Sequence, residues 1–148
     1  MGGCNEKFPN YFYAGSKMNS FGFSSNGRLY QNGTTVNLPS GVSSTWGSKG
    51  DVIGCGIMLH KRQVFFTLNG KFLGIGLKKI DVKQNIFPCV SLLGKDLSFS
   101  INFDETSFCY DLKGCDIFLN KNQTPEVHFI LSIILFSFRS LFLFLYPF

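Results

Sequence analysis

The side chains that could do chemistry in this chain of 148 residues are few and scattered. Of the two histidines, His60 lies in a basic polar stretch and His128 heads a long apolar run, and neither stands in a nucleophile signature. Asp104 and Glu105 are adjacent, a pattern more typical of a solvated loop than of a general acid–base pair. We therefore expect no catalytic residues and predict that the chain is not an enzyme.

The cysteine and glycine patterns likewise predict no metal site and no cofactor. The five cysteines form no Cys-x-x-Cys pair, and three of them (Cys55, Cys89 and Cys109) lie in apolar runs where a free thiol behaves as a small hydrophobe. The glycines match no dinucleotide- or phosphate-binding pattern. Because the first ten residues lack the apolar core of a secretory leader, we expect reduced thiols and a cytoplasmic or nuclear location.

The formal net charge of +5 can favour nucleic acids or anionic membranes. The basic residues are scattered, however, and only two pairs are adjacent, Lys61-Arg62 and Lys78-Lys79. No aromatic residues interleave with these pairs. We therefore interpret the charge as a solvated basic surface and expect no nucleic-acid partner.

The elements that must position any site are clearest at residues 51–75. Three apolar runs are separated there by a polar bend at 60–63 and by Asn69-Gly70, the dipeptide best suited to a two-residue hairpin because both residues tolerate positive φ. This pattern predicts a β-meander. With 45% hydrophobic and only 16% charged residues the chain is too apolar for disorder, and its length is that of one domain.

Turns and short strands continue before the meander. Residues 20–33 read as two strands with turns at Asn26-Gly27 and Asn32-Gly33. Residues 34–50 are rich in glycine, serine and threonine and are predicted to form a long loop. We expect Trp46, which lies in this loop, to be a hydrophobic plug rather than a ligand platform.

Two more strands are predicted after the meander, an apolar one at residues 86–93 and a strictly alternating one at residues 97–103. No convincing helical periodicity appears before residue 126. The predicted fold class is therefore all-β, a twisted antiparallel β-sandwich. The expected core residues are Ile53, Ile57, Phe65, Phe99, Ile101 and Phe103.

The order of these motifs resembles the SPRY domain family over residues 20–112. The segments that carry the resemblance are Ser20-Phe21-Gly22-Phe23, Gly27-Arg28-Leu29-Tyr30, 50–56, 65–70, Leu73-Gly74, Phe87-Pro88 and Ile101-Asn102-Phe103. Residues 108–112 are similar to the short extension that follows the domain in the Ran-binding protein M branch. Because the family's domain normally begins further upstream, the resemblance implies a sandwich that is incomplete at its N-terminus.

The resemblance also implies a function: binding a short peptide segment of a partner protein through loops at one end of the sandwich. In many members this serves as an adaptor or substrate-recognition part of a ubiquitin ligase assembly. Tyr30 falls on a tyrosine that the SOCS-box branch uses for peptide binding, and a strand aromatic that fills the sandwich is an equal alternative. Leu93 and Lys95 fall on the second binding loop of that branch, whose tryptophan this chain lacks. With Arg28 these three residues are the candidate partner-binding set, and Asn69 and Gly70 form the structural turn.

Composition distinguishes an irregular lead-in at 1–19, a linker at 113–126 and an apolar tail at 127–148, and the resemblance implies a partial SPRY domain at 20–112. As a helix the tail would reach about 33 Å, enough for a bilayer core of about 30 Å. We expect a helical tail, and three interpretations stay open. It is a membrane anchor, which would make the chain a membrane protein with a cytosolic SPRY-like domain, or a splice or gene-model artefact, or a buried core segment.

Overall fold

The computed structural model describes residues 15, 16, 18, 20–37, 45–80, 86–92, 98–104, 108–111, 127–137 and 141–147. Strand-forming residues alternate with Gly-containing turns over this part of the chain, and the described residues contain no helix. The strands are β1 (Phe21–Ser24), β2 (Leu29–Gln31), β3 (Thr34–Val36), β4 (Val52–Met58), β5 (Gln63–Leu68), β6 (Lys71–Lys78), β7 (Ile86–Leu92), β8 (Ser98–Asn102), β9 (Val127–Ser137) and β10 (Leu141–Pro147).

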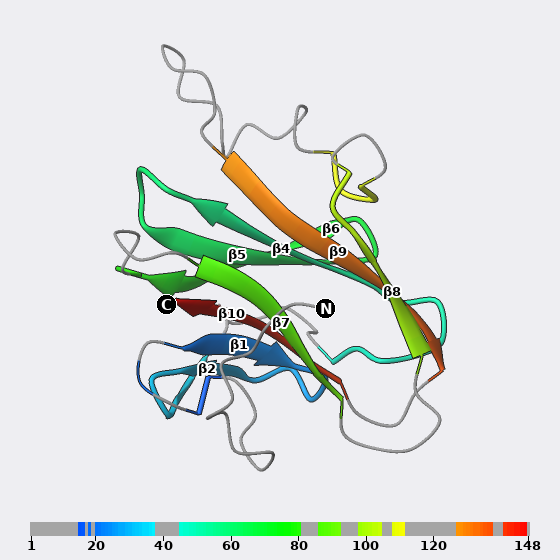
Figure 1. Cartoon of the computed structure of the whole chain (residues 1–148), viewed down its shortest axis with the longest axis horizontal. Helices are drawn as coiled ribbons and strands as arrows, with labels where there is room; N and C mark the ends of the chain where they lie inside the picture. Colours follow the sequence, from blue (N-terminus) through cyan, green and yellow to red (C-terminus); the bar gives the residue numbers. More distant parts are fainter. Residues whose placement is uncertain are drawn as a thin grey trace.

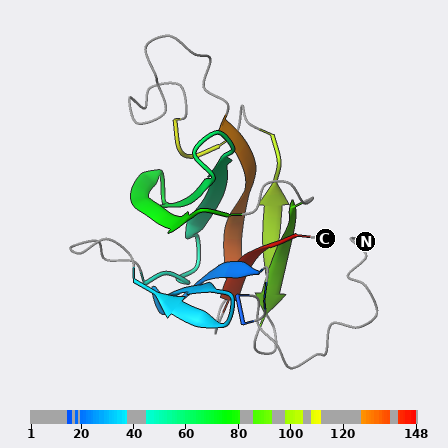
Figure 2. The ribbon, with the colours of Figure 1, turned by 90° about the vertical axis from the view of Figure 1, so that its left-hand side faces the viewer.

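These strands form two five-stranded sheets, and the predicted all-β sandwich is confirmed (Figure 1). The order in the first sheet is β3-β2-β1-β10-β7 and in the second β6-β5-β4-β9-β8. All neighbouring strands pair antiparallel. The view turned by 90° shows β9 beside β4 and β10 beside β1 (Figure 2), so the chain's last two strands belong to different sheets.

The predicted meander is present as β4, β5 and β6. Leu68 pairs with Lys71, which leaves Asn69 and Gly70 as a two-residue turn with φ of 50° and 75°. Positive φ at both positions is what the Asn-Gly dipeptide predicts. One boundary was wrong, because the predicted loop 34–50 begins with a strand, β3, which pairs with β2.

The main core lies between the two sheets and is built from alternate strand residues. Phe23 is fully buried, with its ring centroid 5.0 Å from that of Phe66 and 5.7 Å from that of Trp46. Ile53 and Ile57 are buried in the same cluster, as predicted. Trp46 itself is 6% exposed, so the prediction of a hydrophobic plug is also confirmed.

Phe65 is buried as predicted, but in a second and smaller cluster. It follows Val64 and precedes Phe66 on β5, both of which are in the main core, so its side chain lies on the opposite face of the sheet. There it packs with Met58, and its ring centroid is 5.8 Å from that of Phe72. Residues 108–111 extend this cluster.

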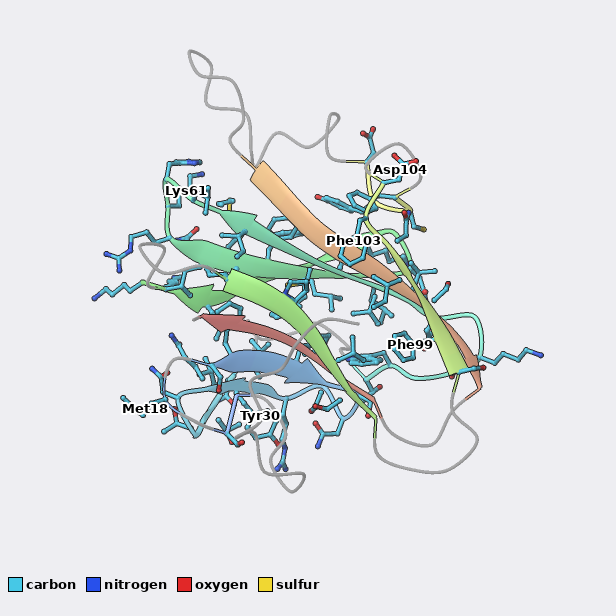
Figure 3. The ribbon with its side chains drawn as sticks, in the orientation of Figure 1. Met18, Tyr30, Lys61, Phe99, Phe103 and Asp104 are labelled. Carbon is cyan, nitrogen blue, oxygen red and sulfur yellow. The ribbon has the colours of Figure 1, made fainter. Side chains whose placement is uncertain are left out.

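The prediction that the apolar face of the alternating strand is buried is wrong for two of its three expected core residues. Phe99 is half-buried and packs against the main core, whereas Ile101 is 40% and Phe103 61% exposed. The reason is position: β8 is the last strand of its sheet and pairs only with β9. Figure 3 shows Phe99 toward the first sheet and Phe103 at the far end of the strand, where the first sheet no longer covers it.

The expected helical tail is not found, because residues 127–137 and 141–147 form β9 and β10. The order of the sheets places β9 between β4 and β8, and β10 between β1 and β7. The three interpretations of the tail remain predictions, and its pairing within both sheets provides a way to test them. Its residues are mostly aromatic, leucine and β-branched, and a run of that kind can form two strands as readily as one long helix. Among the described residues, no helix is long and apolar enough to cross a membrane.

Candidate functional site

Three turns meet at one end of the sandwich and are joined by hydrogen bonds. They are residues 25–28 between β1 and β2, residues 45–51 before β4, and Asn69-Gly70 between β5 and β6. The backbone N–H of Trp46 donates to the carbonyl oxygen of Ser25 at 3.0 Å, which ties the first turn to the second. We term these residues the loop rim.

The first turn of the loop rim is tight and polar. The N–H of Ser24 donates to the carbonyl of Arg28 and the N–H of Gly27 to the carbonyl of Ser24, both at 2.9 Å. The side-chain oxygen of Asn26 accepts from the N–H of Arg28 at 3.1 Å and from the hydroxyl of Ser24. Gly27 has a φ of 81°, which explains the Asn-Gly signal. The result is a rigid turn that presents an exposed Arg28.

Asp51 joins the second turn to the third. One carboxylate oxygen accepts from the N–H groups of Gly47 and Ser48 at 2.7 and 2.8 Å, and the other accepts from the side-chain amide of Asn69 at 2.9 Å. The Asn69 side-chain oxygen in turn accepts from the N–H of Val52 at 2.7 Å. The Asp51 carboxylate therefore closes the second turn through Gly47 and Ser48 and joins it to the third turn through Asn69.

These hydrogen bonds also set the charge state of Asp51. Partial burial raises the pKa of this carboxyl, but the bonds from Asn69, Gly47 and Ser48 together outweigh burial, and the net pKa lies below its ordinary value. Asp51 is therefore ionised at neutral pH. A carboxylate that accepts three hydrogen bonds is a strong fixing point, because charge-assisted bonds exceed neutral ones.

Two aromatic residues support the loop rim from beneath and beside it. Trp46 fills the core below the second turn, and its buried indole nitrogen has no hydrogen-bond partner among the described residues. On the outer side, the ring of Tyr110 stacks on Phe72 at 6.3 Å, just after the third turn. A Cβ at Gly70 would lie 2.9 Å from the carbonyl oxygen of Cys109, so this turn packs closely on residues 108–111.

The structure places the predicted partner-binding residues on different surfaces. Arg28 lies on the loop rim, whereas Tyr30 is half-buried in β2 on the face opposite to Leu29, which is in the core (Figure 3). A Cβ at Gly15 would lie 2.5 Å from the Cβ of Tyr30, so Gly15 packs directly on this tyrosine. Neither Arg28 nor Tyr30 fills the space between the sheets. Leu93 and Lys95 lie outside the described residues.

Sequence reasoning missed Asp51 and Lys49 as parts of a site. Asp51 entered only as the first residue of the meander, although its place directly before a strand and opposite an Asn-Gly turn is a usable signal. Lys49 is exposed between Ser48 and Gly50 and is the second cation of the loop rim. Its signal is weak, because a single lysine in a loop is an ordinary surface residue.

The chemistry available to the described residues is that of binding. No three of their His, Cys, Asp and Glu side chains are grouped as a metal site would require. Burial raises the pKa of the Cys55 thiol, which makes it a poor nucleophile. The loop rim instead offers exposed hydrogen-bonding side chains on a fixed backbone: Asn26, Arg28, Thr45, Ser48 and Lys49.

Comparison with known proteins gives a consistent picture. The model of a family described as the SPRY domain matches residues 1–106. A Ran-binding protein M homolog of Arabidopsis thaliana is 31% identical over 115 residues, which cover 77% of this chain and 23% of that protein. The Ran-binding proteins 9/10 homolog of Drosophila melanogaster is 33% identical over 101 residues, 68% of this chain and 9% of that protein.

A third relative is a large kinase. The dual specificity protein kinase splA of Dictyostelium discoideum is 35% identical over 95 residues, which cover 64% of this chain but 4% of that protein. The chain thus spans less than a quarter of the length of each of these three relatives. No solved structure gave a significant match.

Proposed function

Because the chain belongs to the SPRY domain family, we propose that it is a non-enzymatic recognition module whose loop rim binds a short segment of a partner protein. The family is one of protein-interaction modules, so the broad class follows from membership. The part that is our proposal is the surface and the kind of ligand. The observation that carries it is a set of hydrogen bonds that joins three turns into one edge: Trp46 N–H to the Ser25 carbonyl joins the first turn to the second, and Asn69 to the Asp51 carboxylate joins the second to the third.

A fixed edge of this kind loses little conformational entropy when a ligand binds, because its turns are already ordered. Loops that must be ordered on binding reduce affinity, whereas a backbone already held in its bound conformation does not. Exposed backbone and amide groups can pair with the main chain of an extended peptide, and Arg28 can bind a carboxylate through two parallel hydrogen bonds. The ligand class that fits the loop rim is therefore a short polar peptide with at least one acidic side chain.

The test is a peptide selection followed by affinity measurement on the full chain. Peptides selected from a displayed random library should bind, and Arg28→Ala should weaken the best of them by about tenfold, equivalent to about 1.4 kcal/mol. Lys78→Ala removes the same charge from an exposed residue at the opposite end of the second sheet and should change the affinity by less than about twofold. Equal losses for both variants would show that net charge, not the rim, governs binding.

Tyr30→Ala separates the two surfaces on which the candidate residues lie. If binding falls with Tyr30→Ala and not with Arg28→Ala, the ligand sits on the outer face of the first sheet and the proposal for the loop rim is wrong. Thermal unfolding of each variant would distinguish a lost contact from a lost fold.

An adaptor or substrate-recognition role in a ubiquitin ligase assembly is the finer part of this proposal. Its support is the resemblance, since many members of the family act in this way. A partner captured through the loop rim should then be ubiquitinated in cells by a route that Arg28→Ala blocks. Capture of the partner without any change in its ubiquitination would remove the ligase role and leave peptide binding intact.

A further inference from the structure

Two basic pairs that are far apart in the sequence meet at the other end of the second sheet. Lys61-Arg62 lie in the turn between β4 and β5, and Lys78-Lys79 lie at the end of β6. Gln63 on β5 pairs with Lys78 on β6, so the turn and the strand end are neighbours. With His60 in the same turn, these five exposed residues form what we term the basic end. Lys61 marks its position in Figure 3.

Hydrogen bonds fix the backbone of the basic end. The Nε of Arg62 donates to the carbonyl oxygen of Ile80 at 2.8 Å, and the N–H of Ile80 donates back to the carbonyl of Arg62 at 3.1 Å. Arg62 and Lys79 both have positive φ, 53° and 61°, which is uncommon for residues other than glycine. The fold thus holds four cationic side chains close together, although their mutual repulsion disfavours that arrangement.

The described carboxylates do not neutralise this group. They are those of Asp51, in the loop rim, and of Asp104 and Asp111, which follow β8. Asp81 follows Ile80, and Glu126 precedes Val127, which pairs with Met58. Both acidic residues lie outside the described residues, and even two carboxylates against four cations leave an excess of positive charge. Such a surface attracts an anionic ligand.

The apolar residues decide which anionic ligand fits. The large hydrophobic side chains that are exposed in the described part of the chain are Met18, Ile101 and Phe103, and the basic end contains none of them. Single-stranded nucleic acids are held by base stacking on aromatic residues, and membrane surfaces by insertion of apolar ones. A compact cationic surface without either feature matches a short acidic stretch of polypeptide.

We propose that the basic end binds an acidic segment of a partner protein that is rich in Asp and Glu. This surface is separate from the loop rim, because it lies at the opposite ends of the same strands. Long-range attraction between opposite charges would speed encounter, and the rim would then supply the specific contacts. Binding at the basic end should therefore weaken strongly as salt increases.

The test uses the full chain and labelled peptides of stated composition: six glutamates, a serine-glycine peptide bearing three phosphoserines, and the same peptide unphosphorylated. We expect the two anionic peptides to bind and Lys78→Glu to weaken them by about tenfold, with a larger loss for Lys61→Glu/Lys78→Glu. Lys61→Arg/Lys78→Arg should keep the affinity. Lys71→Glu is the matched control, since it reverses the same charge at an exposed residue at the other end of the same strand.

Every outcome of this experiment bears on the proposal. Binding of the glutamate peptide supports the proposal, and binding of the phosphorylated peptide alone would overturn it. Equal losses for Lys71→Glu and Lys78→Glu, or no binding of either anionic peptide, would overturn it. Tighter binding to an oligothymidine or to vesicles containing anionic lipid than to both peptides would assign the surface to another class of partner. If Lys78→Glu lowers the unfolding temperature, Lys61→Glu is used in its place. The proposal then requires that Lys61→Glu weakens binding without changing the stability of the fold. Because Arg28→Ala leaves the basic end intact, failure at the loop rim is measured independently.

Discussion

Deleting residues 127–148 is the perturbation that separates the possible roles of the apolar tail. In the described part of the chain, β9 pairs with β4 and β8, and β10 pairs with β1 and β7. Without them, β7 and β8 lose the strands that connect each of them to its sheet. An anchor or an artefact of gene prediction would leave residues 1–126 as stable as before, whereas a core segment would not.

The magnitude follows from the strand pairings. The shortest of the four lost pairings, β1 with β10, has four registered residue pairs, which supply about four hydrogen bonds. At a net contribution of about 0.5–1.5 kcal/mol per bond, that pairing alone contributes about 2–6 kcal/mol. Because the total free energy of unfolding of a domain is about 5–15 kcal/mol, the loss of all four pairings should abolish the fold.

Thermal unfolding followed by circular dichroism, with limited proteolysis, is the direct assay. Residues 1–126 should show no cooperative transition and should be cleaved rapidly. Ser132→Pro tests the same point in the full chain, because Ser132 stands opposite Gly54 on one side and Asn102 on the other. Ser100→Pro on the edge strand β8 is the control and should be milder, since proline is tolerated better at an edge. Cooperative unfolding of residues 1–126 at the temperature of the full chain would refute the reasoning.

Three further predictions concern the core, the loop rim and the thiols. Phe23→Ala should lower the free energy of unfolding, measured in urea, by about 3–5 kcal/mol, because the Phe23 ring is fully buried against Phe66 and Trp46. Phe103→Ala is the control and should change the free energy of unfolding by less than about 0.5 kcal/mol. Similar losses for both variants would contradict the assigned core. Asp51→Asn should destabilise by about 1–3 kcal/mol, because it exchanges charge-assisted hydrogen bonds for weaker ones and sets an amide against the Asn69 amide. Since the pKa of Asp51 lies below its ordinary value of 3.8, its contribution is present at higher pH and is lost as the pH falls through the lowered pKa; stability of the wild type and the variant should therefore converge in acid, and a constant difference down to about pH 2 would contradict this account. Cys109 is exposed and should be alkylated rapidly in the folded chain, whereas Cys55 should react only on unfolding, a contrast that mass spectrometry of the labelled peptides would reveal.

Local signals predicted the elements whose structure depends on near neighbours. Asn69-Gly70 dictates its own turn, because its backbone preference is intrinsic, and the flanking apolar runs then pair as a meander. Ile53 and Ile57 are buried because they alternate on β4, which has a strand on each side. Burial at such a position is set by periodicity, and the sequence is sufficient to predict it.

Signals that depend on distant partners were not predictable in the same way. The strand 97–103 has perfect alternation, yet Ile101 is exposed because β8 is the edge strand of its sheet. The hydrophobic periodicity of a segment does not reveal its position in the sheet. The tail has the hydropathy of a membrane helix. Its two strands are recognised only from their pairing with strands of both sheets, which lie far away in the sequence. The basic end was not predictable for the same reason, because Lys61-Arg62 and Lys78-Lys79 become neighbours only through the β5–β6 register.

Hydrogen–deuterium exchange of the full chain with and without a selected peptide tests the central claim, that the loop rim is the binding surface, most directly. Amides of residues 25–28 and 45–51 should gain protection on binding, because these turns would be covered while their own hydrogen bonds stay in place. The amides of β3 and of the Asn32-Gly33 turn, which are not in the rim, should exchange as before. Protection confined to the outer face around Tyr30, or absent from both rim turns at a saturating peptide concentration, would contradict the account.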